Sequence, residues 1–459
     1  MAQNTNNKIN LSMLLDFYEI SMSASYFDFK KDAKAVFDLF IRRMPENRSF
    51  FVAAGLEDIL DYLDNFGFDS GSIEFLKKQG IFSEDFLNYL SNVKFSGEVW
   101  ALREGEIFFP NEPVIRVIAP IIEAQLVESY LLNTINLNAT IATKASRVAM
   151  SAKDRGVYDF SLRRTHGVDS SLKVARASYI AGCNGTSNVL AGMKYKIPVV
   201  GTMAHSFVMS FQNELESFLA YARTFPKNSI LLVDTYDNLK GVKNAITVAK
   251  ELEKTGFKLN GIRLDSGNLV KLSKKVRKIL DQAGLSYVKI FASGNLDEYK
   301  IAKLLKAKAP IDSFGVGTNM GVSEDAPYCD VIYKISEVTD AKGEFSPTMK
   351  LSIGKKTYPG RKQIYRIFDD KGMFAKDILA LEDEGVRGAP LLSKVMEKGK
   401  SIYLSPPIEE IRKFTQDNLL RLPEKYKKLN KAYRYPVVVS QGLKAHTKKA
   451  LKTIRQRSM

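Results

Sequence analysis

The chain has 459 residues, 45% of them hydrophobic and 26% charged, which is typical of a globular protein and excludes a disordered or collagen-like chain. At about 150 residues per domain, two or three domains are expected. Lys and Arg number 68 against 51 Asp and Glu, and this net charge of +17 is spread along the chain. With only two cysteines, neither a disulfide framework nor a cysteine-based zinc site is expected, and we expect a cytoplasmic protein.

Neither targeting nor membrane insertion is indicated by the apolar pattern. The first residues lack a basic segment followed by an apolar core, so we expect no signal peptide. The most apolar stretch, residues 113–132, contains three charged side chains, so we expect no membrane span.

The first 140 residues mix helical and strand-like patterns and form the first predicted domain, 1–140. The spacing of apolar residues predicts a helix over residues 52–65. Residues 99–117 predict short strands, with turns at Gly105 and at Pro110-Asn111.

The second predicted domain, residues 141–336, alternates short apolar runs with amphipathic helical patterns. One helix stripe begins at Leu269 and includes Val276 and Leu280, and Asp297 is the predicted N-cap of a helix over residues 298–306. The predicted strands are residues 157–162, 197–200, 230–233, 261–264, 288–292 and 313–316. Repeated strand-helix-strand units predict a parallel sheet, either a barrel or an open doubly wound sheet.

The third segment, residues 337–459, contains turn signals at Pro359-Gly360 and at 369–372 and becomes helical towards its end. Its tail from Lys444 to Arg457 carries six basic residues and no acidic one. A solvated terminal helix is the favoured interpretation of this tail, over a contact with nucleic acid or membrane.

Polar and glycine-rich motifs follow the predicted strands. Because parallel strands of a barrel end at one face, side chains far apart in sequence are expected to meet there, and glycines there let backbone N–H groups approach a phosphate. The candidates at these strand ends are Arg163, Arg164, His166, Thr202, His205, Asp234, Asp237, Asp265-Ser266-Gly267, Ser293-Gly294-Asn295 and Gly315-Val316-Gly317-Thr318.

Each motif alone has a plainer interpretation. Residues 265–267 could form only a turn before a helix, and the glycines at 315, 317 and 321 are one residue too widely spaced for the dinucleotide-binding fingerprint. Of three histidines, His205 follows a predicted buried strand and is the candidate nucleophile or base. No cluster has zinc spacing, so an expected metal is Mg²⁺, held by substrate phosphates and by one or two carboxylates such as Asp265 or Asp234.

Five motifs closely resemble the nicotinate phosphoribosyltransferase family, in the order of that family and from about residue 11 to at least 366. The motifs are Leu-Asp-Phe-Tyr-Glu-Ile-Ser-Met at 15–22, Gly-Thr-Met-Ala-His-Ser-Phe at 201–207, Arg-Leu-Asp-Ser-Gly at 263–267, Gly-Val-Gly-Thr at 315–318 and Pro-Gly-Arg-Lys at 359–362. The resemblance implies an α/β fold, an irregular parallel α/β barrel packed on a mixed α+β domain formed from the N- and C-terminal parts.

The resemblance also implies an activity. Nicotinate and 5-phosphoribosyl-1-pyrophosphate (PRPP) would give nicotinate mononucleotide and pyrophosphate with Mg²⁺, as a step of NAD salvage, coupled to ATP hydrolysis through phosphorylation of His205. It implies a homodimer whose sites lie at the interface. From the charge pattern and the apolar pattern we expect no nucleic-acid or membrane partner.

The family motifs can be carried over by position. Tyr18, Thr202 and Arg263 correspond to nicotinate-binding positions, and Arg163, Arg164 and Ser206 are further candidates. The residues expected to bind PRPP and its phosphates are Asp265, Ser266, Gly267, Ser293, Gly294, Gly315, Gly317 and Thr318. Position 268 is Asn where the family usually has Asp, and the uncharged Ser187 favours an acid over an amide substrate.

Three alternatives remain open at this point. The same chemistry could act on nicotinamide or quinolinate, or a barrel could act on another sugar phosphate as an isomerase or aldolase. A nucleic-acid-binding protein is motivated only by the net charge.

Overall fold

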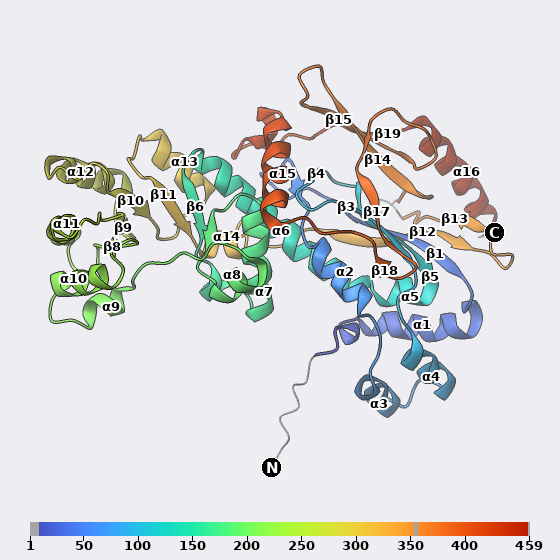
Figure 1. Ribbon diagram of the computed structural model, residues 1–459. Helices are drawn as coiled ribbons and strands as arrows, with labels where there is room; N and C mark the ends of the chain where they lie inside the picture. The colour runs from blue at the N-terminus through green and yellow to red at the C-terminus, as the bar shows by residue number, and fades with distance from the viewer. Residues whose placement is uncertain (1–8, 353–356, 458–459) are drawn as a thin grey trace, which may run out of the picture. The chain divides into compact units, whose positions relative to one another are not determined.

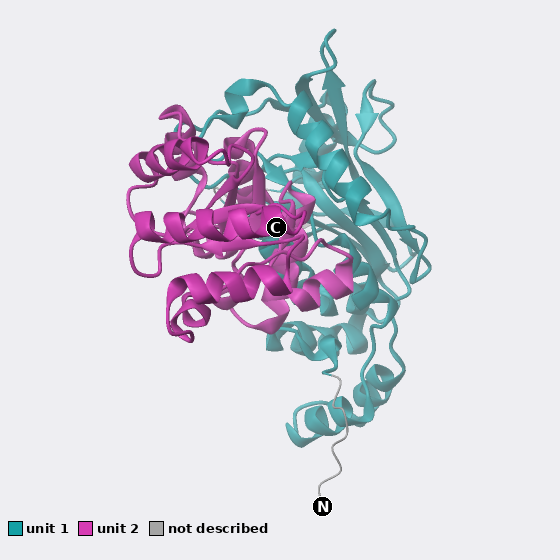
Figure 2. Cartoon of the chain, turned by 60° about the vertical axis from the view of Figure 1, so that its left-hand side comes forward, with its two compact units in different colours: residues 1–140, 328–459 teal, residues 141–327 magenta. Residues whose placement is uncertain are grey.

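The computed structural model describes residues 9–352 and 357–457. The chain divides into two compact units, residues 1–140 with 328–459 as unit 1 and residues 141–327 as unit 2 (Figure 2). No helix in the described ranges has the length and apolarity that a membrane crossing requires.

Unit 2 is built on a six-stranded sheet in which every neighbouring pair is parallel, which confirms the predicted parallel sheet (Figure 1). The order is β7-β6-β11-β10-β9-β8. The strands are β6 (Gly156–Asp159), β7 (Gly185–Thr186), β8 (Ile230–Leu232), β9 (Gly261–Leu264), β10 (Lys289–Ala292) and β11 (Ser313–Val316). Because all six run the same way, the residues that follow them lie at one edge of the sheet.

Helices connect these strands as the apolar spacing predicts. Val276 and Leu280 are buried on α12, and the Asp297 side chain caps α13 by accepting a hydrogen bond from the Lys300 N–H at 2.7 Å. The helices of unit 2 are α7 (Val168–Ile180), α8 (Val189–Tyr195), α9 (His205–Met209), α10 (Glu214–Thr224), α11 (Asn238–Lys254), α12 (Leu269–Gln282), α13 (Glu298–Lys306) and α14 (Thr318–Gly321).

Two strand predictions in this unit were wrong in extent. Residues 197–200 form a single bridge between Val199 and Thr186 instead of a strand, because Pro198 has no N–H to donate to a ladder. The run predicted over residues 157–162 ends as a strand at Asp159, and a 3₁₀ turn, η2 (Leu162–Arg164), follows it.

Unit 1 contains a seven-stranded antiparallel sheet to which both ends of the chain contribute. Its order is β13-β12-β1-β5-β3-β17-β18. The strands are β1 (Lys34–Ile41), β3 (Glu98–Leu102), β5 (Pro113–Pro120), β12 (Val331–Thr339), β13 (Phe345–Pro347), β17 (Leu392–Glu397) and β18 (Lys400–Ser401).

Two smaller sheets and several helices complete unit 1. The predicted turn at 369–372 joins β14 to β15. The helix predicted from residue 52 begins only at Leu56, because residues 51–52 form a strand and Gly55 has a φ of 101°. The further strands are β2 (Phe51–Val52), β4 (Ile107–Phe108), β14 (Lys362–Phe368), β15 (Phe374–Leu381), β16 (Ala389–Pro390) and β19 (Val437–Val439). The helices are α1 (Phe17–Lys30), α2 (Leu56–Asp64), α3 (Ser70–Lys78), α4 (Glu84–Asn92), α5 (Ile121–Leu126), α6 (Glu128–Ala152, which crosses the unit boundary), α15 (Ile408–Arg421) and α16 (Gln441–Arg457).

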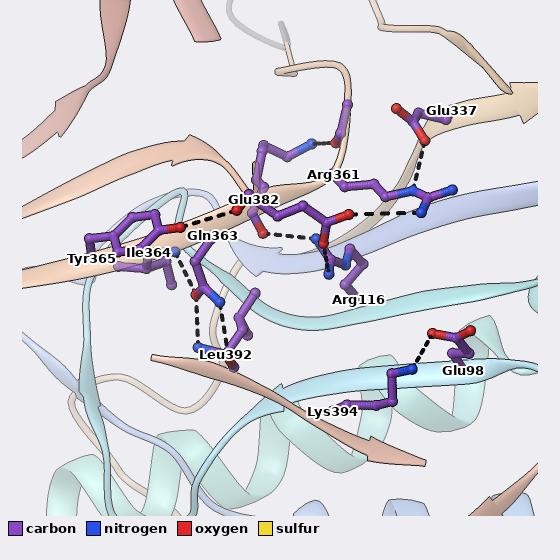
Figure 3. Close-up of polar contacts among 12 residues, drawn as sticks. Glu98, Arg116, Glu337, Arg361, Gln363, Ile364, Tyr365, Glu382, Leu392 and Lys394 are labelled. Carbon is purple, nitrogen blue, oxygen red and sulfur yellow. Dashed lines mark hydrogen bonds and ion pairs between the residues drawn. The ribbon is translucent and has the colours of Figure 1, made fainter. Parts of the chain in front are cut away.

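The Pro-Gly-Arg-Lys motif at 359–362 joins two sheets of unit 1 (Figure 3). Arg361 donates to Glu337 at 3.1 Å and lies 3.8 Å from Glu382. The buried guanidinium of Arg116 contacts Glu382 at 2.5 Å and donates to the Lys362 carbonyl at 3.2 Å. These contacts link β5 and β12 of the larger sheet to the ends of β14 and β15.

Candidate active site

Arg263, at the third position of β9, is the centre of a polar network at the carboxyl edge of the parallel sheet. Its Nε donates to Ser293 Oγ at 2.7 Å, its Nη1 to Thr202 Oγ1 at 3.2 Å and its Nη2 to Asp265 Oδ1 at 2.6 Å. Ser293 Oγ also donates to Asp265. The network brings three strand-end candidates, Thr202, Asp265 and Ser293, together around Arg263, which the family motif supplied.

A second carboxylate, Asp234 after β8, extends this network. Its Oδ2 accepts hydrogen bonds from the backbone N–H of Asp265 at 3.1 Å and from Ser266 Oγ at 2.7 Å. Its Oδ1 is buried and has no hydrogen-bond partner among the described residues. One oxygen of Asp234 therefore holds the 265–266 turn while the other is left for a ligand or water.

The pKa of Asp265 is lowered from its ordinary value. Burial acts to raise it, but the hydrogen bond from Ser293, the charge and hydrogen bond of Arg263 and the charge of His205 together outweigh that effect. Asp265 is therefore ionised at neutral pH.

Two predicted glycines are required by close approaches at this edge. Gly294 has a φ of +94°, and a Cβ there would overlap the carbonyl oxygen of Asp265. A Cβ at Gly315 would lie 2.8 Å from the Phe160 ring and 2.9 Å from the Phe291 ring. Gly317 and Thr318 begin α14, and the Thr318 side chain is exposed.

An aromatic side chain that the sequence reasoning missed lies beside Arg263. The guanidinium carbon of Arg263 is 5.4 Å from the centre of the half-buried Phe160 ring, and Phe160 stacks on Phe291 with centroids 5.6 Å apart. Phe160 directly follows β6, so its place after a strand was the available signal. The site therefore combines a flat apolar face with a guanidinium.

His205 is the first residue of α9 and is half-buried. Its Nδ1 lies 3.1 Å from the hydroxyl of Thr235, which the sequence reasoning also missed although it lies directly after Asp234. The contact fixes the ring orientation and leaves Nε2 available.

Other predicted residues lie outside this network. Arg163 and Arg164 are exposed in η2, and Ser206 is exposed on α9. Gly267, with a φ of +82°, has open space around it. Tyr18 belongs to unit 1, on α1, and is 46% exposed.

Asn268, which departs from the family pattern, and Ser187 both have local roles. The Asn268 side chain caps α12 by accepting from the Lys271 N–H at 3.1 Å, which an Asp would do equally well. Ser187 donates its backbone N–H to the Asp159 carbonyl at 2.9 Å, and its side chain is uncharged. Neither position contributes to the Arg263 network.

A metal site made only of side chains is not present among the described residues, since no group of three or more His, Cys, Asp or Glu is placed to hold an ion. Asp234 and Asp265 are neighbouring acidic residues, because the Asp265 N–H donates to Asp234, and Asp234 has one unpartnered oxygen among the described residues. This donor set suits Mg²⁺, which is usually bound by one or two carboxylates together with substrate phosphates.

Three family models match the chain. The model described as the nicotinate phosphoribosyltransferase (NAPRTase) family matches residues 156–346. The models of its N-terminal and C-terminal domains match residues 13–136 and 385–447.

Curated relatives and solved structures agree with these models. Nicotinate phosphoribosyltransferase pncB2 of Mycobacterium tuberculosis (strain ATCC 25618 / H37Rv) is 46% identical over 434 residues, which cover 94% of this chain and 92% of that protein. Nicotinate phosphoribosyltransferase of Bacillus subtilis (strain 168) is 39% identical over 478 residues, covering 98% and 96%. The crystal structure of human nicotinic acid phosphoribosyltransferase matches with a TM-score of 0.84 and 28% identity, covering 95% of this chain and 99% of that one. That of nicotinate-nucleotide pyrophosphorylase from Pyrococcus furiosus matches with a TM-score of 0.72 and 26% identity, covering 92% and 99%.

The relatives and the matched structures extend over nearly the whole chain, and the family models include four of the five motifs, all but the one at 359–362. The chain therefore belongs to the nicotinate phosphoribosyltransferase family of enzymes.

Proposed function

We propose that this protein joins nicotinate to PRPP and releases nicotinate mononucleotide and pyrophosphate. The observation that carries the proposal is the Arg263 network beside Phe160, in a chain that belongs to this family. We further propose that the six parallel strands form an irregular barrel, that two copies of the chain form the working dimer, and that the enzyme works in the cytoplasm. Cys183 and Cys329 are both buried and in no disulfide, which fits a reducing compartment.

Nicotinate presents a flat ring and a carboxylate. The half-buried face of Phe160 suits the ring, and Arg263 uses three of its five N–H groups in the network, which leaves two for a carboxylate. Thr202 adds a hydroxyl beside the same guanidinium. We assign the second aromatic face to Tyr18, supplied at an interface between two copies, and its exposure supports that assignment. Arg163, Arg164 and Ser206 remain candidates for the rim of this site.

PRPP presents two groups of phosphate oxygens and a ribose. The backbone N–H groups at Gly294, Gly315, Gly317 and Thr318, with the turn at Ser266 and Gly267, are assigned to these oxygens, because glycines allow close approach of the backbone. Asp234 and Asp265 are the residues that would hold Mg²⁺. When bound, Mg²⁺ supplies positive charge that stabilises the leaving pyrophosphate.

The transfer breaks the bond between the sugar C1 and the pyrophosphate oxygen and forms a bond from C1 to the pyridine nitrogen. Both electrons of the broken bond leave with pyrophosphate, and the ring nitrogen supplies the electron pair of the new bond. The nitrogen of nicotinate carries no proton at neutral pH, so the reaction needs no general base. Arg263 and Phe160 act by orienting the ring, and the fixed donors at the strand ends act on the departing charge.

His205 is assigned to energy coupling. In this proposal the ring nitrogen of His205 attacks the γ-phosphorus of ATP, ADP leaves, and later hydrolysis of phosphohistidine returns the free imidazole and phosphate. The Thr235 contact at Nδ1 supports Nε2 as the attacking atom. The histidine is separate from the Arg263 hydrogen bonds, so coupling and transfer use different groups.

The base preference of the purified chain tests this proposal. We expect mononucleotide formation with nicotinate to exceed that with nicotinamide or quinolinate under identical PRPP and Mg²⁺ concentrations. A clear preference for either of the other bases would contradict the substrate assignment, and consumption of none of them would contradict the reaction.

A further inference from the structure

One serine side chain fastens the first turn of α1 to the start of α6. Ser129 Oγ accepts a hydrogen bond from the backbone N–H of Asp16 at 3.2 Å and donates one to Glu19 Oε1 at 2.5 Å. Tyr18 lies between these two attachment points, in the first turn of α1. The Ser129 hydroxyl therefore fixes the part of the helix that carries Tyr18.

The buried carboxyl group of Glu19 depends on the hydrogen bond from Ser129. Glu19 is 0% exposed, and its Oε2 is buried without a hydrogen-bond partner among the described residues. Because a buried carboxyl with few partners is costly, loss of the Ser129 bond would leave Glu19 without its side-chain donor and free the first turn to shift.

The residue before Ser129 acts on the Tyr18 hydroxyl. Glu128 is buried, accepts a hydrogen bond from Gln125 at 2.7 Å and lies 3.9 Å from Lys334 Nζ. Burial raises the pKa of Tyr18, and the charges of Glu128 and Glu19 and hydrogen bonding with Glu128 raise it further. Two consecutive residues of α6 thus contact the backbone and side chains around Tyr18.

We propose that Ser129 is a positioning residue that, through Asp16 and Glu19, holds the Tyr18 ring in the orientation that binds nicotinate. This inference rests on the proposed function, which gives Tyr18 the role of an aromatic face. A stacking contact depends on ring placement, so the residue that fixes the first turn controls affinity for the base without touching it.

The test is steady-state kinetics of Ser129→Ala in the full-length enzyme. We expect KM for nicotinate to rise about tenfold, with kcat and KM for PRPP near wild type, because the side-chain hydrogen bond that holds Glu19 has been removed. Ser129→Thr keeps the hydroxyl and is expected to restore KM for nicotinate. Ser21→Ala is the matched control: it removes a serine hydroxyl that bonds the Phe17 carbonyl of the same helix, at 2.9 Å.

Two further measurements separate the possible outcomes: KM for nicotinate of Tyr18→Ala, and the thermal midpoint of each variant. If Tyr18→Ala raises KM for nicotinate while Ser129→Ala does not, the positioning inference is overturned and the proposed function stands. A lower thermal midpoint with both KM values raised and no restoration by Ser129→Thr would show a general structural role and overturn the inference as well. If Tyr18→Ala binds nicotinate as wild type does, the assigned role of Tyr18 has failed, and the inference fails with it.

Discussion

Arg263 and Asp265 lie two residues apart at the end of β9, and the guanidinium Nη2 meets the carboxylate Oδ1 at 2.6 Å. Along a strand, residues i and i+2 point to the same face, so this pairing follows from their spacing once the strand continues past Leu264. The pair fixes Arg263 in a fork-like orientation and keeps Asp265 ionised.

Replacing Arg263 with Lys should lower kcat/KM for nicotinate by about 10- to 100-fold, because an ammonium cannot make the three directed bonds of the guanidinium. Steady-state kinetics with nicotinate varied would measure this. Arg277→Lys is the control, since Arg277 donates to Asp281 and to two backbone carbonyls away from the site. Equal losses in the two variants would show that the effect is not specific to the site.

Replacing His205 with Ala should abolish stimulation by ATP while retaining some transfer, because the histidine is separate from the Arg263 hydrogen bonds. Thr235→Val should weaken the stimulation less, since it removes only the contact to Nδ1. Nucleotide formation and ATP hydrolysis would be counted together, with Thr247→Val on the exposed side of α11 as the control. Unchanged ATP stimulation in His205→Ala would refute the coupling role.

Gly294→Ala should lower the free energy of unfolding by about 3 kcal/mol or more. The added Cβ overlaps the Asp265 carbonyl oxygen, and the alanine must also adopt a positive φ. Gly284→Ala shares the positive φ, +75°, but has open space around it, so a loss of about 1 kcal/mol is expected. Chemical denaturation of both variants would separate overlap from backbone strain. Equal losses would mean that the close approach at Gly294 contributes nothing.

The stability of unit 1 should depend on pH through Glu19. The pKa of Glu19 is raised from an ordinary 4.5 to about 7, mainly by burial. Hydrogen bonding with Ser129 lowers this pKa, while the charges of Glu128 and Asp16 raise it further. A raised folded-state pKa means that the folded protein favours protonated Glu19. The contribution of Glu19 to the free energy of unfolding is therefore fully present below the ordinary pKa of 4.5 and is lost as pH rises through about 7. Glu19→Gln should therefore flatten the pH dependence of the thermal midpoint between about pH 4.5 and pH 7, and an unchanged slope in that range would contradict the assignment.

The sequence predicted the parts of the fold whose signals are local. The strands β9 and β11 begin and end where the apolar runs do, and Asp297 caps its helix as its position before residue 298 indicates. The prediction failed at residues 197–200, where Pro198 interrupts a run that is otherwise strand-like.

The candidate site could be located but not assembled from the sequence. Placement after the parallel strands predicted that Thr202, Asp265 and Ser293 lie at one edge, and all three contact Arg263, which the family motif supplied. Partners such as Phe160 and Thr235 were missed, since an aromatic or a threonine after a strand has no distinct signal without the contact that it makes. The Ser129 attachment joins residues about 110 positions apart and has no signature in either segment.

The most direct test is nicotinate mononucleotide formation by the full-length chain from nicotinate, PRPP and Mg²⁺, with and without ATP, counting mononucleotide, pyrophosphate and ATP hydrolysed. We predict one pyrophosphate per mononucleotide, stimulation by ATP with linked hydrolysis, and loss of that stimulation in His205→Ala. Product formation without any ATP effect would contradict the coupling through His205. Absence of the mononucleotide under both conditions would contradict the proposed reaction itself.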